Sequence, residues 1–272
     1  PIIRRLLQRL ETLQRSVQRF GEGDLSVRVS EQGQDEVADL ARQFNAAAAR
    51  IEALVKTHKS LLANASHELR SPLTRIRMGL ELMGGNQPSP AFREEILRNI
   101  AELDQLVDEI LLASRLDARE ADVGTVELVD LIGLAAEECA RVDADLDVTA
   151  VPEGLEVRGV AKLLRRALRN LLENARRYSQ GDITVVLQRH DGQAQLSVLD
   201  RGPGVPPALR ERIFEPFYRL PGASERAGGV GLGLALVRSI AQRHNGSVRC
   251  EDQPDGSGGA CFVLRLPLAL TK

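Results

Sequence analysis

Aromatic residues are scarce in this chain of 272 residues, where they make up 3% of the composition and tryptophan is absent. Long helices rich in leucine and alanine suit such a composition better than a large aromatic core does. Cysteine is also rare, and the three residues Cys139, Cys250 and Cys261 lack zinc-ligand spacing, which argues against a disulfide scaffold and against a zinc site. We expect Cys250 and Cys261, if they face each other across a hairpin, to be reduced and to pack as small hydrophobic side chains.

Long apolar runs and a basic net charge are absent as well. No uninterrupted apolar run approaches the ~18 residues of a membrane span, and no secretory signal is recognisable. The formal net charge is −2, so we predict no direct binding to nucleic acid. Hydrophobic residues (43%) and charged residues (27%) occur in ordinary globular proportions, and the length allows two or three modules. Because the chain begins with Pro1 rather than Met, we expect a fragment of a longer protein.

The first 55 residues contain two rows of apolar residues that alternate in steps of three and four. The rows consist of Ile3, Leu6, Leu10, Leu13, Val17 and Phe20, and of Val37, Leu40, Phe44, Ala47, Ile51 and Leu54. This heptad spacing predicts two helices, each of which needs a partner helix. Gly21 and Gly23 end the first helix, and the alternation at residues 25–29 predicts a strand or an extended connector. Asp35 and Glu36 place negative charge where the second helix begins, which suits its dipole.

A generic amphipathic helical hairpin would give the same rows. The connector with its Gly-x-Gly-Asp-Leu segment at 21–25, and the Asp-Glu pair at 35–36, resemble the HAMP signal-relay module of membrane receptors. The resemblance covers residues 1–55 and implies a parallel dimer that forms a four-helix bundle. It also implies that the parent protein is anchored in a bacterial inner (plasma) membrane.

One histidine lies away from the apolar row of the same long helical pattern. The row continues through Val55, Leu62, Ala65, Leu69, Leu73, Ile76, Leu80 and Met83. His67 is two residues from both Ala65 and Leu69, about 200° from the row, so we predict that it faces solvent. A lone exposed histidine is usually a surface residue. Pro72, however, removes a backbone donor about one turn later, and we expect it to kink the helix.

The stretch Ala-Ser-His-Glu-Leu-Arg-Ser-Pro-Leu at 65–73 closely resembles the H-box of two-component sensor histidine kinases. The resemblance implies that His67 accepts the γ-phosphoryl group of ATP through a ring nitrogen. An imidazole with the ordinary pKa of about 6.5 is mostly neutral at pH 7 and therefore nucleophilic. Glu68 would accept a hydrogen bond from the other ring nitrogen. Ser71 stands where many relatives have Thr or Asn that positions water to dephosphorylate the partner, and a serine hydroxyl can still do so.

A loop at 84–90 separates this helix from a second one with its own apolar row. That row contains Phe92, Ile96, Ile100, Leu103, Val107, Ile110 and Ser114. Two such helices predict a hairpin that dimerises into a four-helix bundle. The hairpin matches the dimerisation and phosphotransfer domain of the kinase family over residues 56–117. Whether phosphorylation occurs within one chain or across the dimer stays open, because it depends on how the loop turns.

The second half of the chain changes period. Strand patterns occur at 126–129, 146–151, 183–188, 195–199, 247–250 and 260–266, and helical patterns occur at 130–142, 160–178 and 231–244. Mixed elements of this kind predict an α/β sandwich. Asp191-Gly192 predicts a hairpin turn. His244 precedes Asn245-Gly246 and fits the end of a helix, where cationic character is favoured.

Four motifs follow in a fixed order. They are Asn-Leu-Leu-Glu-Asn at 170–174, Asp-Arg-Gly-Pro-Gly at 200–204, Phe-Glu-Pro-Phe-Tyr-Arg at 214–219 and Gly-Val-Gly-Leu-Gly-Leu at 229–234. Each one alone is weak, because an asparagine pair is usually polar surface and spaced glycines can reflect close packing. The last motif is neither a Walker loop nor a Rossmann fingerprint. Together, downstream of the H-box-like stretch, they resemble the N, G1, F and G2 boxes of the histidine kinase ATP-binding domain, whose fold is related to gyrase-type ATPases and Hsp90.

The resemblance implies ATP and Mg²⁺ as cofactors. It assigns nucleotide binding to Asn170, Asn174, Arg177, Tyr178, Asp200, Gly202, Gly204, Arg219, Gly229, Gly231, Leu232 and Gly233. Asn174 would ligate Mg²⁺, since amide oxygens suit a hard cation, and Asn170 would support its water shell or the phosphates. Asp200 would bind the adenine N6 amine.

The remaining assignments surround the base and the phosphates. Tyr178 would stack near the base, and Arg177, where relatives often have Lys, would contact phosphate oxygens. Arg219 would approach the γ-phosphate. Residues 215–229 would form a mobile lid, and the glycine-rich turn would offer N–H groups to phosphate at a helix N-terminus.

We therefore expect an α plus α/β protein: a parallel coiled-coil HAMP module at 1–55, a four-helix dimer bundle built from 56–117, and an ATPase-type α/β sandwich at 118–272. Its expected function is a protein-histidine kinase that autophosphorylates from Mg-ATP as a homodimer and passes the phosphoryl group to an aspartate of a response regulator. Regulator phosphatase activity is a further expectation. The alternatives are an ATPase of gyrase, mismatch-repair or Hsp90 type and a non-catalytic signalling scaffold.

Overall fold

The computed structural model describes residues 2–82, 89–117, 124–151, 153–179, 181–221, 229–256 and 258–269. The chain divides into two compact units, Pro1–Asn64 and Ala65–Lys272. Among the described helices, none combines the length and the apolar character needed to cross a membrane.

The first unit contains helix α1 (Ile2–Gly21) and the first part of helix α2 (Glu36–Leu82). The predicted boundaries are confirmed, since α1 ends at Gly21 and α2 begins directly after Asp35. An Asp35 carboxylate oxygen accepts the backbone N–H of Ala38 at 2.9 Å, which caps the new helix. Arg9 of α1 forms an ion pair with Asp35 and also donates to the carbonyl of Gln32 at 2.7 Å. The capping residue is thereby tied to α1.

The connector between these helices turns at residues 22–23 and 25–26 and forms no strand over residues 22–35. Asn45 of α2 holds it in place, because its amide accepts the N–H of Val29 at 2.9 Å and donates to the Val29 carbonyl at 2.8 Å. Phe20 and Phe44 pack edge to face, with ring centroids 5.7 Å apart. The side chains buried along this part of α2 are Ala38, Ala41, Ala48 and Leu61. The heptad-row residues Leu40, Ile51 and Leu54 remain at the surface of the single chain.

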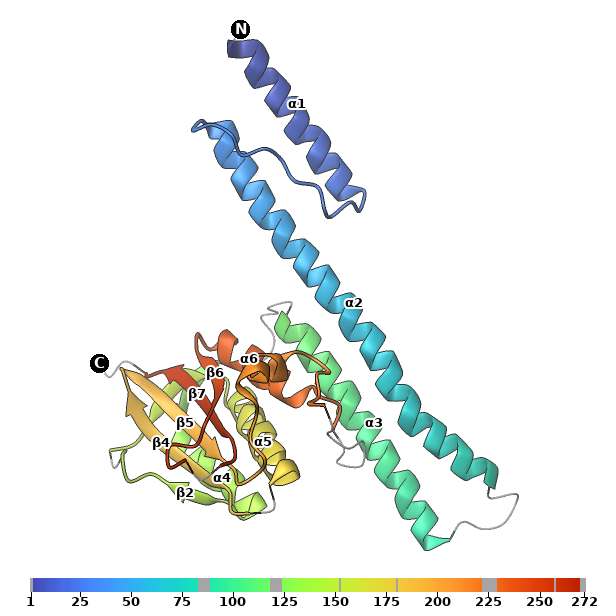
Figure 1. Cartoon of the computed structure of the whole chain (residues 1–272), viewed down its shortest axis with the longest axis vertical. Helices are drawn as coiled ribbons and strands as arrows, with labels where there is room; N and C mark the ends of the chain where they lie inside the picture. Colours follow the sequence, from blue (N-terminus) through green and yellow to red (C-terminus); the bar gives the residue numbers. More distant parts are fainter. Residues whose placement is uncertain are drawn as a thin grey trace. The chain divides into compact units, whose positions relative to one another are not determined.

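The second unit begins with a helical hairpin made of the rest of α2 and helix α3 (Pro90–Asp117), shown in Figure 1. Helix α2 continues through Pro72, which is itself buried. Phe92 of α3 lies against Gly79 of α2. On α3 the buried residues include Leu106, Ala113 and Leu116. Met83 and most of the loop predicted at 84–90 lie outside the described residues.

An α/β sandwich follows the hairpin. Its elements are β1 (Glu127–Asp130), α4 (Leu131–Val142), β2 (Asp145–Asp147), β3 (Glu156–Gly159), α5 (Ala161–Tyr178), β4 (Thr184–His190), β5 (Gln193–Leu199), α6 (Gly233–Arg243), β6 (Ser247–Glu251) and β7 (Cys261–Pro267), with short 3₁₀ turns at Pro207–Leu209 and Arg212–Phe214. Five strands form one sheet in the order β2-β4-β5-β7-β6, and β1 pairs with β3 apart from it. Each predicted strand and helix has a counterpart, although the strand predicted at 146–151 ends at Asp147. Within the described residues, β3 is the strand that the sequence pattern missed.

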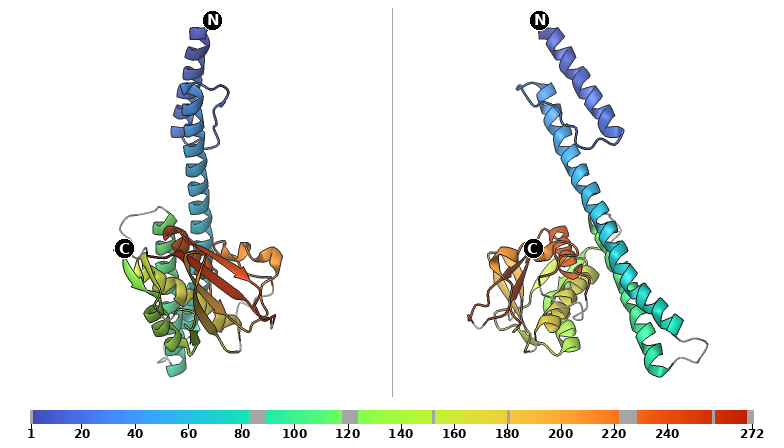
Figure 2. Two further views of the ribbon diagram at one scale, coloured as in Figure 1. Left: turned by 90° about the vertical axis from the view of Figure 1, so that its left-hand side faces the viewer. Right: turned by 45° about the vertical axis from the view of Figure 1, so that its right-hand side comes forward.

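Helices α4, α5 and α6 cover one face of the five-stranded sheet (Figure 2). The strand register explains the core, because residues paired across strands share a face. Val185 pairs with Val198, which pairs with Phe262, and all three side chains are buried. On the helical side, α5 contributes its buried leucines and α6 contributes Leu236 and Ile240. The hairpin turn predicted at Asp191-Gly192 joins β4 to β5, and both residues have positive φ angles.

The expectation that Cys250 and Cys261 are reduced and pack as small hydrophobic side chains is confirmed. Cys250 pairs with Phe262 and Cys261 pairs with Glu251, so the two cysteines point to opposite faces of the sheet instead of facing each other. Both are free and buried, and burial raises the pKa of the Cys250 thiol to about 12.

His244 ends α6, but it is not cationic. Its Nδ1 donates to the Ile240 carbonyl at 2.7 Å and its Nε2 accepts the Val160 N–H at 3.0 Å. These partners fix a neutral tautomer, and burial lowers the pKa of the imidazole.

Candidate active site

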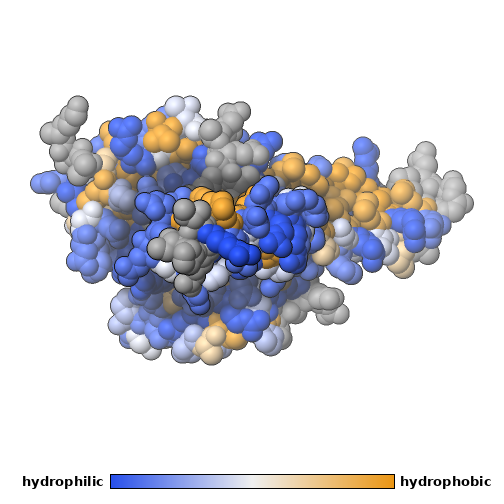
Figure 3. Space-filling view, turned by 90° about the horizontal axis from the view of Figure 1, so that it is seen from above, coloured by the Kyte–Doolittle hydropathy of each residue, from blue (hydrophilic) through white to orange (hydrophobic). Residues whose placement is uncertain are grey.

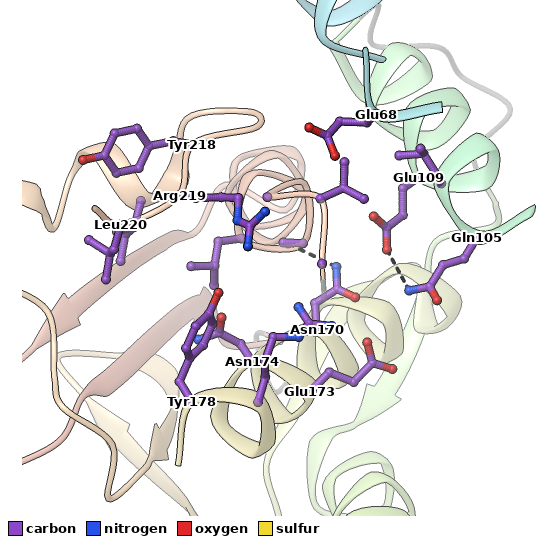
Figure 4. Close-up of a pocket in the computed structure, with 18 of the residues that line it drawn as sticks. Glu68, Gln105, Glu109, Asn170, Glu173, Asn174, Tyr178, Tyr218, Arg219 and Leu220 are labelled. Atoms are coloured by element: carbon purple, nitrogen blue, oxygen red, sulfur yellow. Dashed lines mark hydrogen bonds between the residues drawn. The ribbon is translucent and has the colours of Figure 1, made fainter. Parts of the chain in front are cut away.

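The second unit contains a cavity of about 800 Å³ between the helical hairpin and the α/β sandwich (Figure 4). Most of the residues singled out in the sequence line it. They are His67, Glu68, Ser71, Asn170, Asn174, Arg177, Tyr178, Asp200, Gly204, Arg219, Gly229, Gly231 and Gly233. Gly202 and Leu232 do not line the cavity. Leu232 is fully buried beneath the turn, and Gly202 packs so closely on Tyr178 that a Cβ there would lie 2.6 Å from the Tyr178 carbonyl oxygen.

Helix α5 brings four of these residues to the cavity. Asn170 and Asn174 are four residues apart and therefore share a helix face, and Arg177 and Tyr178 follow at the end of the helix. Asn170 is 5% exposed, and its amide nitrogen donates to the Gly233 carbonyl at 3.1 Å. That bond joins α5 to the first residue of α6. Asn174 makes the wall beside it, and its amide is available to a ligand in the cavity.

Asp200 follows β5 and is buried, with 3% of its surface exposed. Both hydrogen bonds that its carboxylate accepts within the described chain go to Oδ1, from the N–H of Gly202 at 2.8 Å and that of Ala260 at 3.3 Å. Burial raises the pKa of this carboxyl, and the two N–H groups partly offset the rise. The second oxygen is left to accept a ligand donor such as an exocyclic amine.

The glycine-rich turn leads into the N-terminus of α6. Gly231 has a φ of 79°, and its carbonyl accepts the Phe217 N–H at 2.9 Å. Helix α6 begins at Gly233, and no side chain among the described residues caps it. The first N–H groups of a helix have no partner within the helix, and its dipole favours negative charge there. This end of the cavity therefore suits phosphate oxygens.

The aromatic motif before the turn has one end packed in the core and the other end at the cavity. Phe214 is buried and meets Phe262 edge to face at 6.4 Å between centroids. The Arg212 guanidinium lies 4.5 Å from the centre of the Tyr218 ring. Arg219 extends toward the interior of the cavity in Figure 4, opposite Asn174. Residues 222–228 of the predicted lid lie outside the described residues.

The hairpin supplies the opposite wall. His67 is exposed, as its position off the apolar row predicts, and Glu68 and Ser71 line the cavity with it. Four residues of α3 that no motif indicated also line the cavity, namely Glu102, Gln105, Leu106 and Glu109. Gln105 donates to Glu109 at 3.1 Å, and Glu109 accepts a further hydrogen bond at 3.1 Å from Arg166 of α5.

A spacing signal for Glu109 does exist in the sequence. Leu106, Glu109, Ala113 and Leu116 follow each other in steps of three and four, which places an acid within an apolar row. All four residues are buried in the structure.

The cavity fits a nucleotide-bound Mg²⁺ better than a metal held by protein alone. No group of three or more His, Cys, Asp or Glu side chains in the described parts of the chain is arranged to hold a metal ion. Mg²⁺ usually keeps several waters and takes one or two protein oxygens together with substrate phosphates. The Asn174 amide beside the N-terminus of α6 matches that donor set.

Three family models match the chain in succession. They are the HAMP domain at residues 2–53, the His Kinase A (phospho-acceptor) domain at 57–119, and the histidine kinase-, DNA gyrase B- and HSP90-like ATPase at 159–270. The chain is 36% identical over 262 residues to the sensor protein RstB of Escherichia coli (strain K12), an alignment that covers 94% of this chain and 59% of RstB. It is 34% identical over 250 residues to the signal transduction histidine-protein kinase/phosphatase MprB of Mycobacterium sp. (strain KMS), covering 86% of this chain and 48% of MprB.

Among solved structures, the histidine kinase AdeS of Acinetobacter baumannii superposes with a TM-score of 0.61 at 22% identity, covering 74% of this chain and 98% of AdeS. That likeness concerns the fold. With the three domain models in this order, and with these relatives, the chain belongs to the two-component sensor histidine kinases. It spans roughly half to three fifths of the length of the two curated relatives described above.

Proposed function

We propose that this chain is the signalling core of a sensor kinase that phosphorylates His67 from Mg-ATP and passes the phosphoryl group to an aspartate of a response regulator. The observation that carries the proposal is the shared cavity, which His67 lines together with Asn174, Asp200 and the glycine-rich turn. A nucleotide bound in this cavity would therefore lie in the same space as its acceptor histidine.

The proposed reaction forms a bond from a ring nitrogen of His67 to the γ-phosphorus and breaks the bond to the β–γ bridging oxygen, which leaves with ADP. The proton of the attacking imidazole passes to Glu68, the neighbouring carboxylate. Such transfer depends mainly on positioning and on charge neutralisation. Arg219, Arg177 and the N–H groups of α6 provide positive charge for the phosphates, and Asp200 orients the base.

Mg²⁺, when bound with the nucleotide, would neutralise phosphate charge. Asn174 would provide a protein oxygen for it, and Asn170 would hold the first turn of α6 in place through its bond to Gly233. In this proposal Asn174 contacts the ligand, whereas Asn170 supports the fold.

A homodimer is part of the same proposal. Apolar side chains on the hairpin helices are exposed in the single chain and gather on the helical surface (Figure 3). The most exposed are Leu73, Met78, Leu80, Leu97 and Leu111. A contiguous apolar face of this kind suits a second copy, which would complete a four-helix bundle. The regulator's receiver domain would then dock on the hairpin, and the parent protein would be anchored in the bacterial inner membrane.

Regulator phosphatase activity is a second candidate. Ser71 lines the cavity one turn after His67, where its hydroxyl can position a water molecule. The relative MprB is named a kinase/phosphatase. Release of phosphate from a phosphorylated regulator, measured with wild type and Ser71→Ala, tests this role, and equal rates would refute it.

Labelling with γ-³²P-ATP and Mg²⁺ tests the kinase proposal. We expect acid-labile label on the wild type, no label on His67→Gln, and no label on Asn174→Ala. Undiminished acid-labile label on His67→Gln would overturn the acceptor assignment. Steady release of free phosphate without a phosphoprotein would favour an ATPase of the gyrase or Hsp90 type instead.

A further inference from the structure

An ion pair connects the hairpin to the ATP-binding domain. Glu109 of α3 is 7% exposed, and an oxygen of its carboxylate lies 3.1 Å from an Nη of Arg166 on α5. Gln105, one turn earlier on α3, donates to the same carboxylate oxygen. Figure 4 shows Gln105 and Glu109 at the side of the cavity that faces α5.

The two charged residues belong to different domains. Glu109 lies within the match to the phospho-acceptor domain, and Arg166 lies within the match to the ATPase domain. Arg166 is one helical turn before Asn170 and two turns before Asn174. A contact made by Arg166 therefore positions the helix that carries both asparagines. On the other side of the contact, α3 packs beside α2, which carries His67.

Burial makes this pair selective for one arrangement. Burial raises the pKa of the Glu109 carboxyl, whereas Gln105 and Arg166 oppose that rise. The Arg166 Nε is also buried and has no hydrogen-bond partner in the described parts of the chain. A largely buried pair adds little net stability, but the buried Glu109 carboxylate is costly if it is left without Arg166. The pair therefore favours a single register of α5 against α3 more than it favours the fold itself.

We propose that Glu109 and Arg166 are positioning residues for phosphoryl transfer, which hold α5 against α3 so that the nucleotide at Asn174 faces His67. This role rests on the proposed kinase function. It concerns the alignment of donor and acceptor, so it predicts an effect on the rate of transfer and not on the binding of nucleotide.

Charge reversal and charge exchange in the full chain test the proposal. We expect Glu109→Arg and Arg166→Glu each to lower the labelling rate of His67 at saturating ATP by roughly tenfold to a hundredfold, the size of effect that a small misalignment produces. The KM for ATP and the affinity for a fluorescent ATP analogue should stay within about twofold, since no nucleotide contact changes. The double exchange Glu109→Arg/Arg166→Glu should recover most of the lost rate.

The matched control is Glu137→Arg. Glu137 pairs with Arg165, the neighbour of Arg166, but that pair joins α4 to α5 within one domain, and the Glu137 side chain is 64% exposed. The Glu137→Arg substitution should leave the labelling rate of His67 unchanged. If a reversal variant unfolds, Glu109→Gln and Arg166→Gln replace it, and both should lower the rate without changing nucleotide affinity.

Unaltered labelling rates in the single variants, or a double exchange no better than the product of the single effects, would overturn the positioning role. So would loss of nucleotide affinity in parallel with loss of rate. A wild type that takes up no label would instead refute the proposed kinase function, so the two failures are distinguishable.

Discussion

Gly231 and Gly233 stand two residues apart in one turn, but the fold makes different demands on them. Gly231 has a φ of 79°, and a Cβ there would lie 2.9 Å from the Phe217 carbonyl carbon. Gly233 has no left-handed backbone, and the nearest atom to a Cβ would be in the Asn170 side chain at 3.7 Å, an ordinary contact. The structure thus requires glycine at the first position, whereas only a ligand would require it at the second.

We expect Gly231→Ala to destabilise the chain by about 2 kcal/mol, because a side chain is strained in that backbone region. Gly233→Ala should change stability by less than about 1 kcal/mol, since alanine fits and is less flexible in the unfolded chain. Both should weaken nucleotide binding, because a methyl group would stand where phosphate approaches the N–H groups of α6. Denaturant unfolding and titration with a fluorescent ATP analogue measure the two effects. Equal unfolding midpoints for the two variants would contradict this account.

Motifs predicted the cavity-lining residues better than they predicted the supporting ones. His67, Asn174 and Asp200 belong to short local patterns, so their chemistry is visible in sequence. Arg166 and Glu109 are 57 positions apart, and their contact exists only once α3 and α5 meet. Leu232 lies inside a motif but is fully buried, because the glycines on either side place the backbone, not this side chain, at the cavity.

At the scale of elements, His244 connects two helices. Its Nε2 accepts the N–H of Val160, the residue just before α5, and its Nδ1 donates within α6. The bond from Val160 needs the neutral ring, because a protonated Nε2 cannot accept. Burial lowers the pKa of this imidazole, so the folded state binds fewer protons than the unfolded state. Its contribution to stability is therefore present above the ordinary pKa of about 6.5 and is lost as the pH falls toward the folded value.

Unfolding midpoints between pH 7.5 and pH 5 check this sign. We expect wild type to lose stability across that range and His244→Gln to start lower but to change less with pH. His190→Gln is the control, because His190 is an exposed residue at the end of β4. A wild-type profile that His244→Gln leaves unchanged in slope would show that this imidazole is not responsible.

Helices α4 and α5 are joined by a buried acid. The Glu138 side chain is 2% exposed and receives two hydrogen bonds from Arg169, at 2.9 and 3.0 Å, and one from Arg165 at 3.2 Å. The hydrogen bonds from Arg169 contribute most to lowering the pKa of this carboxyl. The paired charge is satisfied only while both helices are in place.

Glu138→Gln should destabilise the chain by about 2 kcal/mol, because it replaces a buried charged acceptor of three hydrogen bonds with a neutral amide. Glu137→Gln, one residue away and largely exposed, should cost less than about 0.5 kcal/mol. Denaturant midpoints compare the two directly. If both substitutions lowered the free energy of unfolding equally, burial would not explain the contribution of Glu138 to stability.

Element prediction succeeded where a local stop signal exists. Gly21 ends α1, Asp35 caps α2, and Asp130 caps α4 by accepting the N–H of Ile132 at 2.9 Å. Strand β3 was missed because its four residues, Glu-Val-Arg-Gly, carry a single large apolar side chain. It forms through pairing with β1, a partner nearly thirty residues earlier, which no window of the sequence contains.

At the scale of the whole molecule, the exposed part of the apolar rows suits the second copy that we propose. Leu13 and Ala65 of these rows are buried within the single chain, whereas many other row residues are part-buried or exposed, and further buried positions such as Ala38, Leu106 and Ala113 lie off the rows. Sequence periodicity thus indicated the surface that we propose for an association between chains. It could not tell that surface from the one packed within the chain, because both repeat in steps of three and four.

The cavity also allows a prediction of whether the phosphoryl group is transferred within one chain or between two chains. His67 and Asn174 of the same chain line the same cavity, and Glu109 and Arg166 of that chain connect its two walls. We therefore expect transfer within a chain.

A mixed dimer of His67→Gln with Asn174→Ala tests this expectation. One chain lacks the acceptor histidine and the other lacks the nucleotide site, so neither should be labelled. Copurification through a tag on one chain verifies that mixed dimers form, and wild type mixed with His67→Gln gives the positive signal. Label on the Asn174→Ala chain of the mixed dimer would mean that its His67 receives the phosphoryl group from its partner, and would refute transfer within a chain.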